Sequence, residues 1–249
     1  MKFWYLSLAV LLGITGCGKS DSKTADPKPT PTFTGTVKLA DEFGHDQTAR
    51  SGVLITVTDV SPQVTAETGA DGTFALLGVP AGNHTISYTK AGYGTYWWFY
   101  VPTSSAGGSV LPEVTLGQVS TSIVTLQVVR SGSMYLVNGT VSPLPTATQP
   151  RVHRLYLQDG DNTAPSPIAS SYALTLAKPV RLDGTFVDTL TRAQLAAVRL
   201  ASTNGTNVRV RAAGDNPAAT TYRDGTTGQL VYPAANLSAN PRSVIFYSN

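Results

Sequence analysis

The chain has 249 residues and a formal net charge of +3, and this weak charge excludes the basic surface that nucleic-acid binding requires. A single cysteine excludes an internal disulfide and a thiolate zinc site. Hydrophobic residues make up 41% of the sequence, which is enough to build one or two folded domains rather than a disordered chain.

The sequence opens with a short apolar segment. Lys2 precedes an apolar run from Phe3 to Ile14, which is too short to span a bilayer because that takes about 20 apolar residues. A positive start, a short apolar core and small residues behind it are typical of a secretory signal peptide. We therefore predict a signal peptide over residues 1–16.

The end of this segment carries a second signal. Ile14-Thr15-Gly16-Cys17 resembles the lipobox of bacterial lipoproteins, and it contains the only cysteine of the sequence. The resemblance implies cleavage between Gly16 and Cys17, a diacylglyceryl thioether on Cys17, and an acyl group such as palmitate on the new amine. Gly18 in place of an aspartate implies delivery to the outer membrane. The alternative is an ordinary signal peptide with a chance cysteine.

Residues 17–32 comprise the lipidated cysteine and a polar segment. Residues 18–32 include three prolines and no large apolar side chain, so they cannot bury enough surface to fold. Alternating prolines hold a chain extended at about 3.1 Å per residue. We predict a flexible tether that carries the folded part away from the lipid.

A β-rich unit is predicted over residues 33–118. Apolar residues recur there with period two, which is typical of strands with one buried face. Asp71-Gly72 supplies the positive φ angles that a tight hairpin needs. The predicted strands are Phe33–Leu39, Val53–Val57, Phe74–Leu76, Thr85–Thr89 and the aromatic run that follows Gly94.

The order of residues in this unit resembles a carboxypeptidase regulatory-like domain. The matching residues are Gly35-Thr36-Val37, Gly52-Val53, Thr68 to Phe74, Leu77 to Ile86 and Ala91-Gly92-Tyr93. The resemblance implies a transthyretin-like (prealbumin-like) β-sandwich without a catalytic centre of its own. Such modules act as folding aids, spacers or docking surfaces.

Five consecutive aromatic residues are the most unusual chemistry of the sequence. Because side chains alternate along a strand, we expect one face to carry Tyr96, Trp98 and Tyr100, and the other to carry Trp97, Phe99 and Val101. One face enters the core. The other is covered by the second domain, or it forms a surface on which sugars, peptides or proteins stack. The candidate ligand or partner surface is therefore Tyr96, Trp97, Trp98, Phe99 and Tyr100.

Residues 119–249 are expected to form a second β-sandwich. Short strands separated by polar turns at regular spacing predict a sandwich or barrel. A short helix is expected at Thr191–Val198, where Thr191 and Gln194 have the spacing of a capping box. A helix before the next strand resembles the crossover of immunoglobulin-like modules. The predicted strands are Ile123–Val129, Tyr135–Val141, Val152–Leu157, Tyr172–Leu176, Gly184–Val187, Asn207–Ala212 and Ser243–Tyr247.

The sequence contains no motif for a catalytic centre, and no cofactor or metal is expected. The three histidines are far apart, and no nucleophile elbow, phosphate-binding loop or zinc-protease motif occurs. Asp159 and Asp161 are similar to the start of a calcium loop. However, Ala164 stands where that loop needs glycine, and Ser170 stands where it needs glutamate. A hairpin turn is the preferred interpretation.

Together these features predict an all-β, two-domain lipoprotein that its lipid anchors at the outer membrane. We expect a non-enzymatic binding or scaffolding module whose partner is a glycan or an envelope protein. One alternative is a carbohydrate-binding accessory lipoprotein that uses Tyr96–Tyr100. A second alternative is an enzyme, which requires a pocket lined by two or more of the loop acids Asp159, Asp161, Asp215 and Asp224.

Overall fold

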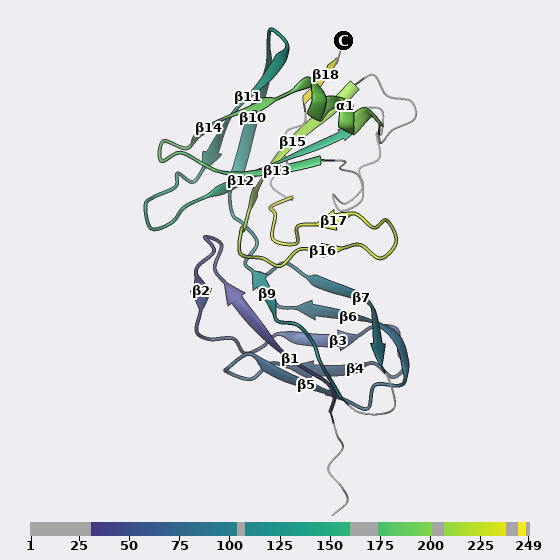
Figure 1. The fold of residues 1–249 in the computed structure, drawn as a ribbon. Coiled ribbons are helices and arrows are strands. Elements are labelled where there is room, and N and C mark those ends of the chain that lie inside the picture. The colour runs from purple at the N-terminus through teal and green to yellow at the C-terminus, as the bar shows by residue number, and fades with distance from the viewer. Residues whose placement is uncertain (1–30, 104–107, 160–173, 201–206, 238–243, 248–249) are drawn as a thin grey trace, which may run out of the picture.

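Two β-sandwiches, joined through a short linker, make up the computed structural model (Figure 1). The structure describes residues 31–103, 108–159, 174–200, 207–237 and 244–247. The following predicted features lie outside these ranges: the signal peptide with its cleavage site between Gly16 and Cys17, the lipidation of Cys17, the tether up to residue 30 and the turn residue Asp161. The elements that are described confirm the predicted all-β class and the pair of sandwiches.

The first sandwich is built on the long strand β1. In one sheet, β1 pairs antiparallel with β2 and β5 and parallel with β8 and β9. The other sheet has the order β4-β3-β6-β7, so the aromatic strand β7 lies at its edge. The strands are β1 Pro31–Ala40, β2 Asp46–Gln47, β3 Leu54–Val57, β4 Val64–Glu67, β5 Thr73–Leu77, β6 Gly82–Thr89, β7 Tyr96–Thr103, β8 Ser109–Val110 and β9 Val114–Gly117.

Period-two patterning explains the core of this sandwich. Phe33, Val37 and Leu39 on β1 are fully buried, as the alternation predicts, and they pack in one cluster with Ile55 and Ile86 of the facing sheet. Each such side chain contributes about 1.5–3 kcal/mol when it leaves water. The core therefore fixes which face of each strand is left for other contacts.

The second sandwich has sheets of order β10-β11-β14 and β13-β12-β15-β18. This order is that of strands A-B-E and C′-C-F-G in an immunoglobulin-like sandwich. The predicted helix is present as α1, and Thr191 caps it as expected, because Thr191 and Gln194 exchange hydrogen bonds between backbone and side chain. The elements are β10 Ile123–Ser131, β11 Met134–Ser142, β12 Val152–Asp159, β13 Leu174–Pro179, β14 Thr185–Leu190, α1 Arg192–Leu200, β15 Asn207–Asp215 and β18 Val244–Tyr247.

The connection between β15 and β18 leaves the second sandwich and packs on the first. It holds two short strands, β16 Tyr222–Arg223 and β17 Leu230–Val231, which pair as a hairpin. Figure 1 shows this yellow-green hairpin between the two sandwiches, and β16 contacts β7. We call residues 216–237 the strap.

Candidate ligand-binding site

The aromatic run forms the edge strand β7, whose two faces meet different surroundings. Tyr96 and Trp98 pack against the core of the first sandwich. Trp97 and Phe99 alternate with them and stack on each other, with ring centroids 6.1 Å apart and planes inclined by 17°. Two aromatic rings therefore face away from the core, as the alternation predicted.

The predicted alternation is wrong at the end of the run. Phe99 and Tyr100 together oppose the single β6 residue Thr85, because the pairing shifts between His84 and Ile86. Such a bulge moves every later side chain to the other face. Val101 is consequently buried, at 4% exposure, and Tyr100 is 70% exposed, which reverses the faces expected for these two residues.

The strap covers part of the outward face of β7. The Tyr222 ring lies 5.6 Å from the ring of Tyr96 and 6.3 Å from that of Phe99. The phenol of Tyr100 donates a hydrogen bond to the carbonyl of Gly225, at 3.1 Å. A Cβ atom on Gly225 would lie 2.5 Å from the Phe99 ring, so glycine is what allows the loop to approach this closely.

An open cleft of about 470 Å³ remains between β7 and the strap. All five residues of the candidate surface line it, so the structure brings them together with the strap. The lining residues are Tyr96, Trp97, Trp98, Phe99, Tyr100, Thr221, Tyr222, Arg223, Asp224, Gly225 and Gly228. The sequence marked Asp224-Gly225 as a turn, but no local signal connects that turn with a strand 125 residues away.

One cation and one anion lie in the cleft, and both are engaged within the strap. Arg223 Nη1 donates to the carbonyl of Gly228 at 3.0 Å. Asp224 Oδ1 accepts from the backbone of Thr226 and from the backbone and hydroxyl of Thr227, at 2.8–3.1 Å. The Thr227 bonds hold the pKa of Asp224 below its ordinary value, so this carboxylate stays ionised.

The cleft contains polar donors that no described residue engages. Within the ranges the structure covers, the indole N–H groups of Trp97 and Trp98 make no hydrogen bond. The phenol of Tyr222 is another donor that stays protonated, because burial and the neighbouring Asp224 raise its pKa to about 12. The cleft therefore combines flat apolar rings with donors that a ligand can satisfy.

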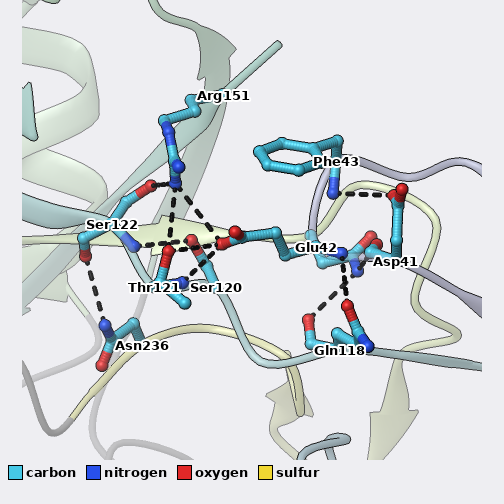
Figure 2. A network of polar contacts seen from close by, with 10 residues as sticks. Asp41, Glu42, Phe43, Gln118, Ser120, Thr121, Ser122, Arg151 and Asn236 are labelled. Carbon is cyan, nitrogen blue, oxygen red and sulfur yellow. Dashed lines mark hydrogen bonds and ion pairs between the residues drawn. The ribbon is translucent and has the colours of Figure 1, made fainter. Parts of the chain in front are cut away.

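The two sandwiches meet at a second place, which we call the joint. Arg151, at 7% exposure, reaches across it, and its Nη1 donates to Ser122 Oγ at 2.8 Å and to Glu42 Oε2 and Thr121 Oγ1 at 3.4 Å. Its guanidinium lies over the ring of Phe43 (Figure 2). The joint comprises Asp41, Glu42, Phe43, Gln118, Ser120, Thr121, Ser122, Arg151 and Asn236.

The strap runs from the joint to the cleft. Near its start, Asn216 Nδ2 donates to the carbonyls of Asp41 at 2.7 Å and Gln118 at 3.1 Å. Further along, the Thr220 N–H donates to the Thr115 carbonyl at 2.9 Å, and Thr220 Oγ1 accepts from the Thr115 N–H at 2.8 Å. These bonds tie the strap to β9 of the first sandwich and so hold one wall of the cleft.

Of the four loop acids proposed for an enzyme, two have described side chains, and these two do not meet at the cleft. Asp224 lines it, but Asp215 is 3% exposed and pairs with Arg154, whose Nη2 is 2.6 Å from Asp215 Oδ2. The side chain of Asp159 and all of Asp161 fall outside what is described. In the described part of the chain, no three His, Cys, Asp or Glu side chains are grouped so as to hold a metal ion.

The second sandwich contains a buried cluster that the sequence did not indicate. His153 Nε2 and Lys178 Nζ each lie 2.6 Å from an oxygen of Asp188, and His153 and Asp188 are almost fully buried. Burial raises the pKa of Asp188, but the bonds from His153 and Lys178 outweigh it and leave the pKa below its ordinary value. The cluster joins the two sheets and does not line the cleft.

Comparison with solved structures gives distant matches. No protein-family model matches the chain, and no curated protein matches it. One solved structure is a candidate carbohydrate-binding protein from Bacteroides uniformis, 12% identical, with a TM-score of 0.28 over 88% of this chain and 100% of that one. Another is a DUF3823 family protein from Parabacteroides merdae, 11% identical, with a TM-score of 0.28 over 83% of this chain and 98% of that one.

A third match is a chain of a cohesin–X-dockerin complex from Acetivibrio cellulolyticus, 21% identical, with a TM-score of 0.29 over 35% of this chain. The present chain spans 58% of the length of that chain. Because these matches are distant, the interpretation of the cleft rests on the residues of this chain.

Among the described residues, no helix is long and apolar enough to cross a membrane.

Proposed function

We propose that this chain is a non-enzymatic, lipid-anchored binding module of the cell envelope, and that it holds a neutral glycan in the cleft between β7 and the strap. One observation carries the proposal. The cleft is walled by aromatic rings of β7 and the strap, yet the indole donors of Trp97 and Trp98 have no partner among the described residues.

Sugars combine the two features that this lining can recognise. A pyranose ring has a flat apolar face that stacks on an aromatic ring, and hydroxyl groups around its edge that exchange hydrogen bonds. Trp97 and Phe99 provide the stacked rings, and Tyr222 provides a protonated phenol beside them. The volume of about 470 Å³ lies within the usual range of ligand pockets, which is about 300–1,000 Å³.

The charges of the lining favour an uncharged ligand. Arg223 and Asp224 cancel each other, and each is already bonded within the strap. A charged sugar would leave water for a cleft that offers no surplus of the opposite charge, and this desolvation costs free energy. We therefore expect neutral glycans to bind more tightly than uronic acids or amino sugars.

Binding can be measured with the mature chain carrying Cys17→Ser, which removes the predicted lipid. Trp97 and Trp98 are then its only tryptophans, and both line the cleft. Titration with cellohexaose, xylohexaose and maltohexaose should change their fluorescence for at least one sugar. Hexamers of galacturonic acid and glucosamine should bind more weakly. No response to any neutral hexasaccharide, or a response to a proline-rich peptide instead, would contradict the proposal.

A matched pair of variants separates binding from folding. Trp97→Ala should weaken binding of the neutral sugar about tenfold or more by calorimetry, because it removes one stacking ring. Tyr93→Ala removes an aromatic side chain that packs on the core of the first sandwich but does not line the cleft. It should lower the melting temperature and leave the affinity unchanged. Equal affinity of both variants would exclude this cleft as the sugar-binding site.

The lipid anchor has its own test. Several acyl chains on one cysteine hold a protein stably on a membrane, because each buried methylene contributes about 0.8 kcal/mol. Labelled palmitate should enter the wild-type chain in bacterial cells, and the chain should fractionate with the outer membrane. Cys17→Ser should take up no label. Equal labelling of both forms would refute the anchor without affecting the cleft.

A further inference from the structure

Tyr100 has a backbone conformation that its side chain disfavours. Its φ angle is +58°, and it is the one non-glycine residue with a positive φ among those the structure describes. A bulky aromatic residue rarely adopts this left-handed region, where glycine is the usual choice. The surroundings of Tyr100 must therefore hold it in place.

Folding alone does not explain this conformation. Tyr100 is 70% exposed, so its ring gains little from burial. A glycine at the same bulge would keep the backbone path that returns Val101 to the core, without the strain. Strained residues that the fold does not require gather at binding and catalytic sites.

The bulge does, however, enlarge the aromatic wall of the cleft. It turns Tyr100 away from the core on the side of Phe99, whose ring centroid is 6.5 Å away. The phenol then reaches the strap and donates to the carbonyl of Gly225 at 3.1 Å. The ring is thereby fixed between the two walls, and it lines the cleft with Trp97 and Tyr222.

We propose that Tyr100 is a ligand-contacting residue that sets the affinity of the cleft, and that its strained backbone is retained for this contact. The proposal rests on the proposed function, because it assigns a role within the same cleft. The ring of Tyr100 packs against an apolar sugar face, and its oxygen, which is a donor to Gly225, still accepts a hydrogen bond from a sugar hydroxyl.

Three substitutions of Tyr100 test the ring and the backbone separately. Tyr100→Ala and Tyr100→Gly both remove the ring, so both should weaken binding of the neutral hexasaccharides about tenfold by calorimetry. Tyr100→Phe keeps the ring and should bind within about threefold of the wild type. Tyr100→Gly should melt about 2–4 °C above Tyr100→Ala, because glycine relieves the positive φ.

The stability order tests the strained backbone, since alanine is ordinarily more stable than glycine within a strand. The loss of affinity tests the ligand contact, because a merely structural tyrosine would not change it. Wild-type affinity in Tyr100→Ala and Tyr100→Gly, together with a loss in Trp97→Ala, would overturn the role of Tyr100 and leave the proposed function standing. A Tyr100→Ala variant that melts above Tyr100→Gly would refute the claim that the backbone of Tyr100 is strained. Absence of sugar binding by the wild type would remove both proposals.

Discussion

The joint and the cleft both lie between the two sandwiches, but their chemistry differs. The joint is polar and closed, and Arg151 donates hydrogen bonds to both Glu42 and Ser122 there (Figure 2). The cleft is aromatic and open, and within the described part of the chain the indole donors of Trp97 and Trp98 have no partner. Among the described residues, Arg151 Nε is the one buried side-chain polar atom of the joint without a partner, whereas the cleft keeps its indole donors for a ligand.

The strap connects the joint with the cleft. It bonds to the carbonyls of Asp41 and Gln118 near the joint, and it presents Tyr222 and Gly225 to β7 at the cleft. The joint should therefore set how stable the pair of sandwiches is. The cleft should set what they bind.

The largest expected effect is on stability and comes from the joint. Arg151→Ala removes a buried cation and leaves Glu42 without it, which should lower the free energy of unfolding by about 3 kcal/mol. Arg50→Ala is the matched control, since Arg50 pairs with the exposed Asp46 and should cost less than about 1 kcal/mol. Urea denaturation measures both. Equal losses would show that the joint is no more important than a surface ion pair.

A smaller effect is expected where the strap crosses from the joint to the cleft. A Cβ atom on Gly94 would lie 2.4 Å from the carbonyl of Pro233, so Gly94→Ala should push the strap away at a cost of about 1–3 kcal/mol. It should also weaken sugar binding, because the strap forms one wall of the cleft. Gly69→Ala is the control, because its Cβ atom would lie 3.2 Å from the Asp71 side chain and 3.9 Å from the Thr73 carbonyl, which are milder contacts. Unchanged affinity in Gly94→Ala would show that the strap does not take part in sugar binding.

The smallest effect concerns pH at the cleft. Burial and Asp224 raise the pKa of Tyr222 to about 12, from its ordinary value of 10.0. Between these values the unfolded chain loses the proton and the folded chain keeps it, so Tyr222 makes stability fall as pH rises from about 10 to about 12. Tyr222→Phe cannot ionise and should lose less stability between pH 9 and pH 11 in urea titrations. An equal loss of stability in both proteins would show that Tyr222 is exposed to water and that its pKa is not raised.

Local patterns made much of the fold predictable. Alternation identified the buried face of β1 at Phe33, Val37 and Leu39, and it separated Tyr96 and Trp98 from Trp97. The spacing of Thr191 and Gln194 located the cap of α1. These features depend on neighbours in sequence, and this is why a single sequence reveals them.

The cleft could not be predicted from local patterns in the sequence. The bulge at Tyr100 adds one residue to β7, and nothing in a run of five aromatics indicates where the alternation breaks. Tyr222 and Gly225 reach β7 from a connection between strands of the other sandwich, where the sequence shows only a turn. Contacts at such separation depend on how the sandwiches dock, through side chains such as Arg151.

The most direct test of the central claim is hydrogen–deuterium exchange of the mature chain, with and without a neutral hexasaccharide that binds. We expect slower exchange in two segments at once, residues 96–101 of β7 and residues 221–228 of the strap, because both walls contact the ligand. The joint should exchange slowly in both states. Slower exchange elsewhere, with both segments unchanged, would contradict the account.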